Sequence, residues 1–120
     1  MNTLEYEREL AIHRLDLATS KVHELEQRLF LAQEQMQRAI RAESDVCRYN
    51  TITRKQNLET ATYERKLAAH KTTMAASDVH ILRNALAEAR KKEEKAVQAK
   101  AEAYRALSLA RGYSLIEENS

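Results

Sequence analysis

Small and apolar residues recur every seven positions along most of the chain. In the second half, Ala61, Ala68, Ala75, Leu82, Ala89, Ala96, Ala103 and Ala110 follow this spacing, and three residues before each of them stand Leu58, Arg65, Thr72, Val79, Leu86, Glu93, Lys100 and Leu107. A seven-residue repeat of this kind makes a narrow seam along one side of a helix, and small residues on that seam allow another helix to approach closely. The pattern therefore predicts a helix that packs along another helix.

The first half carries a similar seam. One set of positions reads Leu4, Ala11, Ala18, Leu25, Ala32, Ala39 and Val46, and the second reads Arg8, Leu15, Val22, Leu29, Met36 and Glu43. Asn2 followed by Glu5 is typical of a capping box at a helix N-terminus. This pattern predicts a helix over about 3–48, which is roughly 65–70 Å long at a rise of 1.5 Å per residue.

The repeat is interrupted over about 49–57 and resumes at Leu58, one residue out of phase. Asn50, Thr51 and Thr53 are weak helix formers because they are β-branched or bond to their own backbone. This segment is either the bend of an antiparallel hairpin or a skip in one continuous coiled-coil helix, with the Asn fixing its register. We favour an all-α protein, in which helices over about 3–48 and 58–111 form a long antiparallel helical hairpin with an alanine-rich seam.

The hairpin has two possible registers, in which the numbers of facing residues sum to 104 or to 111. The first register sets Leu29 against Ala75, whereas the second sets Leu4 against Leu107, and the sequence does not choose between them. At the other end of the chain, Gly112 is the single glycine, and glycine commonly ends a helix. We therefore expect residues 1–111 to form the hairpin and residues 112–120 to form a C-terminal tail.

Composition and charge agree with this architecture. The chain of 120 residues has one Gly, no Pro and 32% charged residues, which suits long helices and coiled coils. Its six aromatic residues are few for a compact globule of this length. The net charge is −3 over residues 1–45 and +7 over residues 46–111, where 14 Lys and Arg oppose seven Asp and Glu. These opposite charges favour the two halves lying side by side.

A second apolar stripe lies beside the seam, mostly one residue before its alanine and leucine positions. A two-helix hairpin would leave this stripe in water, and exposed apolar patches commonly mark a partner surface. Scattered surface leucines are also common, which is the plainer interpretation. We expect six residues to meet a further helical partner, either in a homo-oligomer or in a larger assembly: Leu10, Leu17, Phe30, Leu31, Ile81 and Leu109.

Basic residues gather around the predicted bend. They are Arg48, Arg54, Lys55, Arg65, Lys66 and Lys71, which we call the basic tip. The basic tip fits an acidic protein partner, or a nucleic acid if Tyr49 and Tyr63 add stacking, although no DNA- or RNA-binding motif is present. The plainer explanation is that these cations balance the acidic first helix.

We predict no catalytic, metal or cofactor site. Di-iron bundles use Glu-x-x-His units, but serine stands three residues before His23 and before His80. Cys47 is the only cysteine, so the sequence predicts no intrachain disulfide and a reducing compartment. One glycine cannot build a phosphate-binding loop. No apolar run approaches the roughly 18 residues of a membrane span, and no signal peptide is evident. We expect a cytoplasmic protein, or one carried within a larger particle.

These features favour a non-catalytic coiled-coil protein that oligomerises or braces a larger complex through helix–helix contacts. The alternative is a small adaptor or inhibitor that binds an acidic protein through the basic tip, and a nucleic-acid-binding hairpin is a third possibility. The plan resembles small helical-hairpin and coiled-coil adaptor proteins in architecture alone, and architecture does not fix function.

Overall fold

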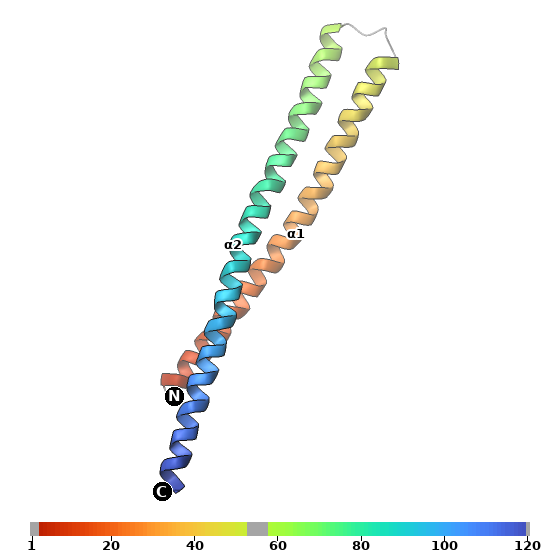
Figure 1. The fold of residues 1–120 in the computed structure, drawn as a ribbon. Helices are drawn as coiled ribbons and strands as arrows, with labels where there is room; N and C mark the ends of the chain where they lie inside the picture. The colour runs from red at the N-terminus through yellow and green to blue at the C-terminus, as the bar shows by residue number, and fades with distance from the viewer. Residues whose placement is uncertain (1–2, 53–57, 120) are drawn as a thin grey trace. The chain divides into compact units, whose positions relative to one another are not determined.

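A computed structural model of the chain describes residues 3–52 and 58–119, and these residues form two α-helices. Helix α1 spans Thr3–Ile52 and helix α2 spans Leu58–Asn119 (Figure 1). The two long helices pack against each other in opposite directions, with the start of α1 beside the end of α2 and the end of α1 beside the start of α2. The predicted antiparallel hairpin is confirmed, and the alternative of one continuous coiled-coil helix is wrong.

The chain divides into two compact units, and each unit pairs one stretch of α1 with one stretch of α2. Unit 1 contains Met1–Glu24 and Leu86–Ser120, and unit 2 contains Leu25–Ala85. The predicted seam is the core of both units, because all 13 seam positions of α1 are buried or half-buried. The buried apolar residues are Ala11, Val22, Leu86, Ala89 and Leu107 in unit 1, and Leu25, Ala32, Ala68 and Val79 in unit 2.

The register lies close to a sum of 111. In unit 1, the guanidinium of Arg8 lies 5.8 Å from the centre of the Tyr104 ring, and these residue numbers sum to 112. In unit 2, the residues that line one groove span 28–35 of α1 and 78–82 of α2, and the midpoints of these two ranges, 31.5 and 80, sum to 111.5. The register that sums to 104 is therefore excluded, and Leu4 is set opposite Leu107 in unit 1.

The predicted end of the second helix is wrong. Helix α2 continues through Gly112 to Asn119, so the expected tail of residues 112–120 is helical as far as Asn119. Gly112 does not adopt the left-handed backbone conformation of a helix-ending glycine. Glycine inside a helix costs about 1 kcal/mol relative to alanine, which the neighbouring turns can offset. No proline follows Gly112 to enforce a stop.

Helix α1 also extends further than predicted, to Ile52, where about 48 was expected. The weak helix formers Asn50 and Thr51 each cost only a few tenths of a kcal/mol, which is too little to end a long helix by themselves. Two other threonines, in the middle of α2, bond back to its backbone: the Oγ1 of Thr72 donates to the Ala68 carbonyl at 3.1 Å, and that of Thr73 donates to the Ala69 carbonyl at 3.0 Å. Most of the predicted bend, residues 53–57, lies outside the described residues.

Candidate functional site

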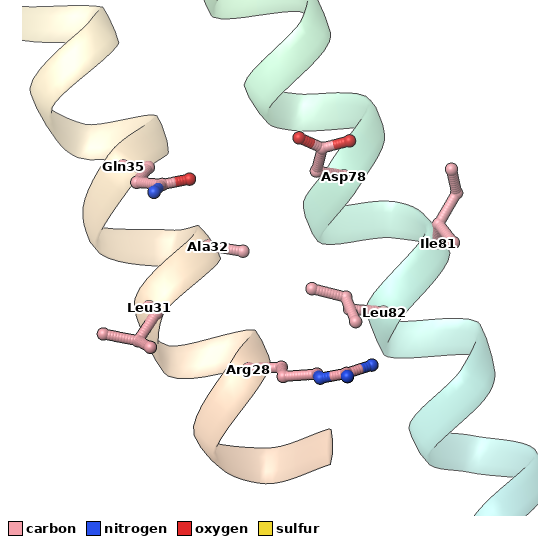
Figure 2. A pocket seen from close by; sticks show the side chains of 7 residues that line it. All are labelled: Arg28, Leu31, Ala32, Gln35, Asp78, Ile81 and Leu82. Carbon is pink, nitrogen blue, oxygen red and sulfur yellow. The ribbon is translucent and has the colours of Figure 1, made fainter. Parts of the chain in front are cut away.

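An open groove of about 420 Å³ lies between α1 and α2 in unit 2 (Figure 2). We call it the unit 2 groove; its lining residues are Arg28, Leu31, Ala32, Gln35, Asp78, Ile81 and Leu82. Ala32 and Leu82 belong to the seam and are buried and half-buried, so they form the floor. Leu31 and Ile81 stand at the outer edges and are 57% and 60% exposed. The groove therefore presents apolar surface from both helices to solvent.

The helical repeat explains why Leu31 and Ile81 flank one groove. Each residue directly precedes a seam residue of the set that includes Ala32 and Leu82, and one step along a helix turns the side chain by about 100°. We call this position the shoulder of the helix. An antiparallel helix pair has an approximate two-fold axis between its helices, so equivalent shoulders lie on the same side of the pair. The register then sets Leu31 and Ile81, whose numbers sum to 112, across the groove from each other.

Charged and polar residues mark the two ends of the unit 2 groove. The Arg28 side chain extends from α1 toward α2 at one end, and Gln35 and Asp78 stand at the opposite end (Figure 2). The groove therefore has a positive end and a negative end on either side of its apolar centre. This polarity follows from the antiparallel pairing, because Arg28 lies three residues before Leu31 and Asp78 lies three residues before Ile81.

The groove of unit 1 has a different lining. It measures about 630 Å³, and its lining residues are Glu7, Leu10, Ala11, Arg14, Ala18, Lys92, Lys95, Ala96, Ala99, Glu102, Ala103 and Ala106. Six alanines and five charged residues line it, and Leu10 is the only large apolar member. This groove offers a partner little apolar surface beyond that of small side chains.

The structure brings two of the six predicted interface residues together, Leu31 and Ile81 in the unit 2 groove. Leu10 is half-buried in the unit 1 groove. Leu17, Phe30 and Leu109 are exposed but line neither groove.

The sequence interpretation missed the polar residues Arg28, Gln35 and Asp78. Each of them directly precedes a seam residue, namely Leu29, Met36 and Val79. This spacing identifies them as groove residues once the register is known.

The basic tip is exposed wherever the structure describes it. Arg48, Arg65, Lys66 and Lys71 are all exposed, and Arg54 and Lys55 lie outside the described residues. Exposed Tyr63 lines a shallow hollow of about 350 Å³ on α2, together with Glu59, Thr62 and Lys66.

Three further observations concern metal ligands, the cysteine and membrane spans. Within residues 3–52 and 58–119, no three His, Cys, Asp or Glu side chains gather in a way that could hold a metal ion. The thiol of Cys47 is exposed on α1. Among the described residues, neither helix has a stretch apolar enough to span a membrane.

Comparison of the chain with protein families, with curated proteins and with solved structures finds no match. Any functional argument therefore depends on the surfaces of the hairpin itself.

Proposed function

We propose that this protein is a non-catalytic helical assembly protein that packs a further helix into its unit 2 groove. The observation that supports this proposal is the pairing of Leu31 and Ile81, each more than half exposed, across a floor of Ala32 and Leu82. Side chains from both helices thus form ridges with a depression between them. A third helix can pack its own side chains into such a depression.

The two exposed side chains contribute part of the free energy of packing a partner helix. Full burial of a leucine or isoleucine side chain contributes about 1.5–3 kcal/mol. Since Leu31 and Ile81 have already buried part of their surface, a partner helix would gain roughly 1 kcal/mol from each. The alanine floor lets the partner backbone approach closely, which extends the contact along the groove.

Site-specific photo-crosslinking tests this proposal in the cells that naturally express the protein. A photoreactive phenylalanine analogue is placed at Leu31 or Ile81, and the control position is Asn84, which is exposed on α2 and is not a groove residue. We expect discrete protein adducts at Leu31 and Ile81 and none at Asn84. The absence of adducts at both groove positions, in chains that remain helical, would contradict the proposal.

A second candidate function uses the basic tip to bind an acidic protein partner. It is favoured by the exposure of Arg48, Arg65, Lys66 and Lys71 in one half of unit 2. Reversal of two of these charges, Arg65→Glu with Lys66→Glu, would then abolish the interaction and leave groove crosslinks intact. The matched control is Arg90→Glu with Lys92→Glu in unit 1. A nucleic-acid partner would instead bind with a steep dependence on salt concentration, which a titration of random DNA and RNA measures.

A further inference from the structure

We propose that a second copy of this chain packs its helices against the unit 2 groove. The two copies are related by a two-fold axis perpendicular to the helices, so that their grooves run in opposite directions. The proposal rests on the proposed function of this groove and names its partner. Two observations support it: the groove carries opposite charges at its two ends, and its apolar centre is formed equally by the two helices.

The charge distribution makes the groove complementary to itself. Along α1, Arg28 lies three residues before Leu31 and Gln35 lies four residues after it. At 1.5 Å per residue, the ends of the groove lie about 4.5–6 Å from the centre. A two-fold axis through Leu31 and Ile81, perpendicular to the helices, sets the positive end of each copy on the negative end of the other. Arg28 of one copy then meets Gln35 and Asp78 of the other.

The same charges select against the opposite orientation. If the two hairpins ran parallel across the groove, Arg28 would lie over the Arg28 end of the other copy, and Asp78 over the Asp78 end. Like charges brought together at an interface are costly and suppress the wrong arrangement. A symmetric interface also uses one surface twice, so a single groove is sufficient.

The experiment uses the full chain and measures self-association by sedimentation. The variants are Ile81→Glu, Arg28→Glu and Asp78→Arg, and the control is Leu109→Glu, an exposed apolar shoulder residue in unit 1. We expect a wild-type dimer that Ile81→Glu converts to monomer and that Leu109→Glu leaves intact. Each charge variant alone is expected to weaken association at least about tenfold, because like charges then meet in the dimer. Circular dichroism confirms that each variant is helical.

Mixing the two charge variants is the decisive step. One variant is labelled at the exposed Cys47 thiol, and its partner is titrated into it. In a mixed dimer, the glutamate introduced by Arg28→Glu in one chain meets the arginine introduced by Asp78→Arg in the other, and the remaining native Arg28 and Asp78 meet each other. We therefore expect the mixture to recover an affinity within about threefold of wild type. A charge pair within one chain could not be restored in this way, so failure to recover would overturn the end-for-end arrangement.

The remaining outcomes separate this proposal from the proposed function. A wild-type chain that stays monomeric, while crosslinks from Ile81 join it to a foreign protein, would overturn the second copy and leave the assembly function standing. A dimer that Ile81→Glu does not disrupt would place self-association elsewhere and overturn the proposal. A chain that neither dimerises nor crosslinks would overturn both.

Discussion

The two units of the hairpin have the same repeat and the same register, but they differ on the shoulder of α2. In unit 2 this position carries Leu67, Met74 and Ile81, all exposed, whereas in unit 1 it carries Glu88, Lys95 and Glu102 before Leu109. The seam closes the helix pair in both units. The shoulder then decides whether the closed pair also offers an apolar groove. The residues that pair the helices and the residues that line the groove are therefore encoded one position apart in the same repeat.

The seams of the two units differ as well. The seam of unit 1 contains Arg8, Glu93 and Lys100, all half-buried. Tyr104 lies beside them, 5.8 Å from Arg8 and 5.9 Å from Lys100, measured to the ring centre. Arg8 also pairs with Glu9 at 3.3 Å, but its Nε is buried without a hydrogen bond. The seam of unit 2 also contains a half-buried charge, Glu43, so unit 1 is distinguished by the aromatic ring that lies beside its cations.

The largest effect is expected from removing one buried leucine in each unit. Leu25→Ala in unit 2 and Leu107→Ala in unit 1 each delete a side chain that is almost fully buried. We expect a loss of about 2–3 kcal/mol of unfolding free energy, at the low end for leucine because a two-helix core can partly collapse. Urea denaturation measures the total loss, and hydrogen exchange shows which unit has opened. If either substitution lowered the protection from hydrogen exchange equally in both units, the division of the hairpin into two units would be contradicted.

Adding volume to the seam should have the next largest effect. Ala89→Leu places a large side chain where the helices approach closely, because Ala89 is buried in unit 1. We expect overpacking to cost about 1–3 kcal/mol. Ala87→Leu is the matched control, since Ala87 is exposed two residues earlier on α2. If the two variants had the same melting temperature, the inference that the helices approach closely at Ala89 would be wrong.

The sequence predicted the helices and their seam but could not choose the register, for a physical reason. The two candidate registers differ by seven, the length of the repeat, so either one sets seam against seam. Residues that break the repeat decide between them. In the rejected register, Arg8 would lie opposite Ala96, about two helical turns away from Tyr104. The contact between Arg8 and Tyr104 selects the register that sums to 111.

The groove was predictable in part. Leu31 and Ile81 were recognisable as apolar residues beside the seam, because the repeat places them there. Their position across one groove depends on the register, which the repeat alone leaves open. Gly112 was misinterpreted because a glycine late in a helical pattern has the same appearance whether it ends the helix or lies inside it.

A smaller effect is expected from the contact between Arg8 and Tyr104 in unit 1. A cation stacked on an aromatic ring contributes about 0.5–1 kcal/mol at a partly exposed site. A double-mutant cycle with Arg8→Met and Tyr104→Leu isolates this coupling, since methionine keeps much of the packing of the arginine stem. The control cycle combines Arg14→Met with Tyr104→Leu and should show no coupling. If the losses of unfolding free energy in the first cycle were additive, Arg8 and Tyr104 would not be coupled. Arg8 would then not be the residue that fixes the register.

The smallest effect is expected at Gly112, where the sign of the change is more informative than its size. At a position inside a helix, alanine is more stable than glycine by about 0.5–1 kcal/mol. Near a helix terminus, the gain in stability is at the low end of this range. A Cβ at Gly112 meets no atom within 4 Å, so Gly112→Ala should stabilise the protein slightly in thermal unfolding. Ser108→Ala, at an exposed position one turn earlier, calibrates the gain from helix propensity alone. A helix-ending glycine would respond in the opposite direction, because alanine is strained in the left-handed conformation.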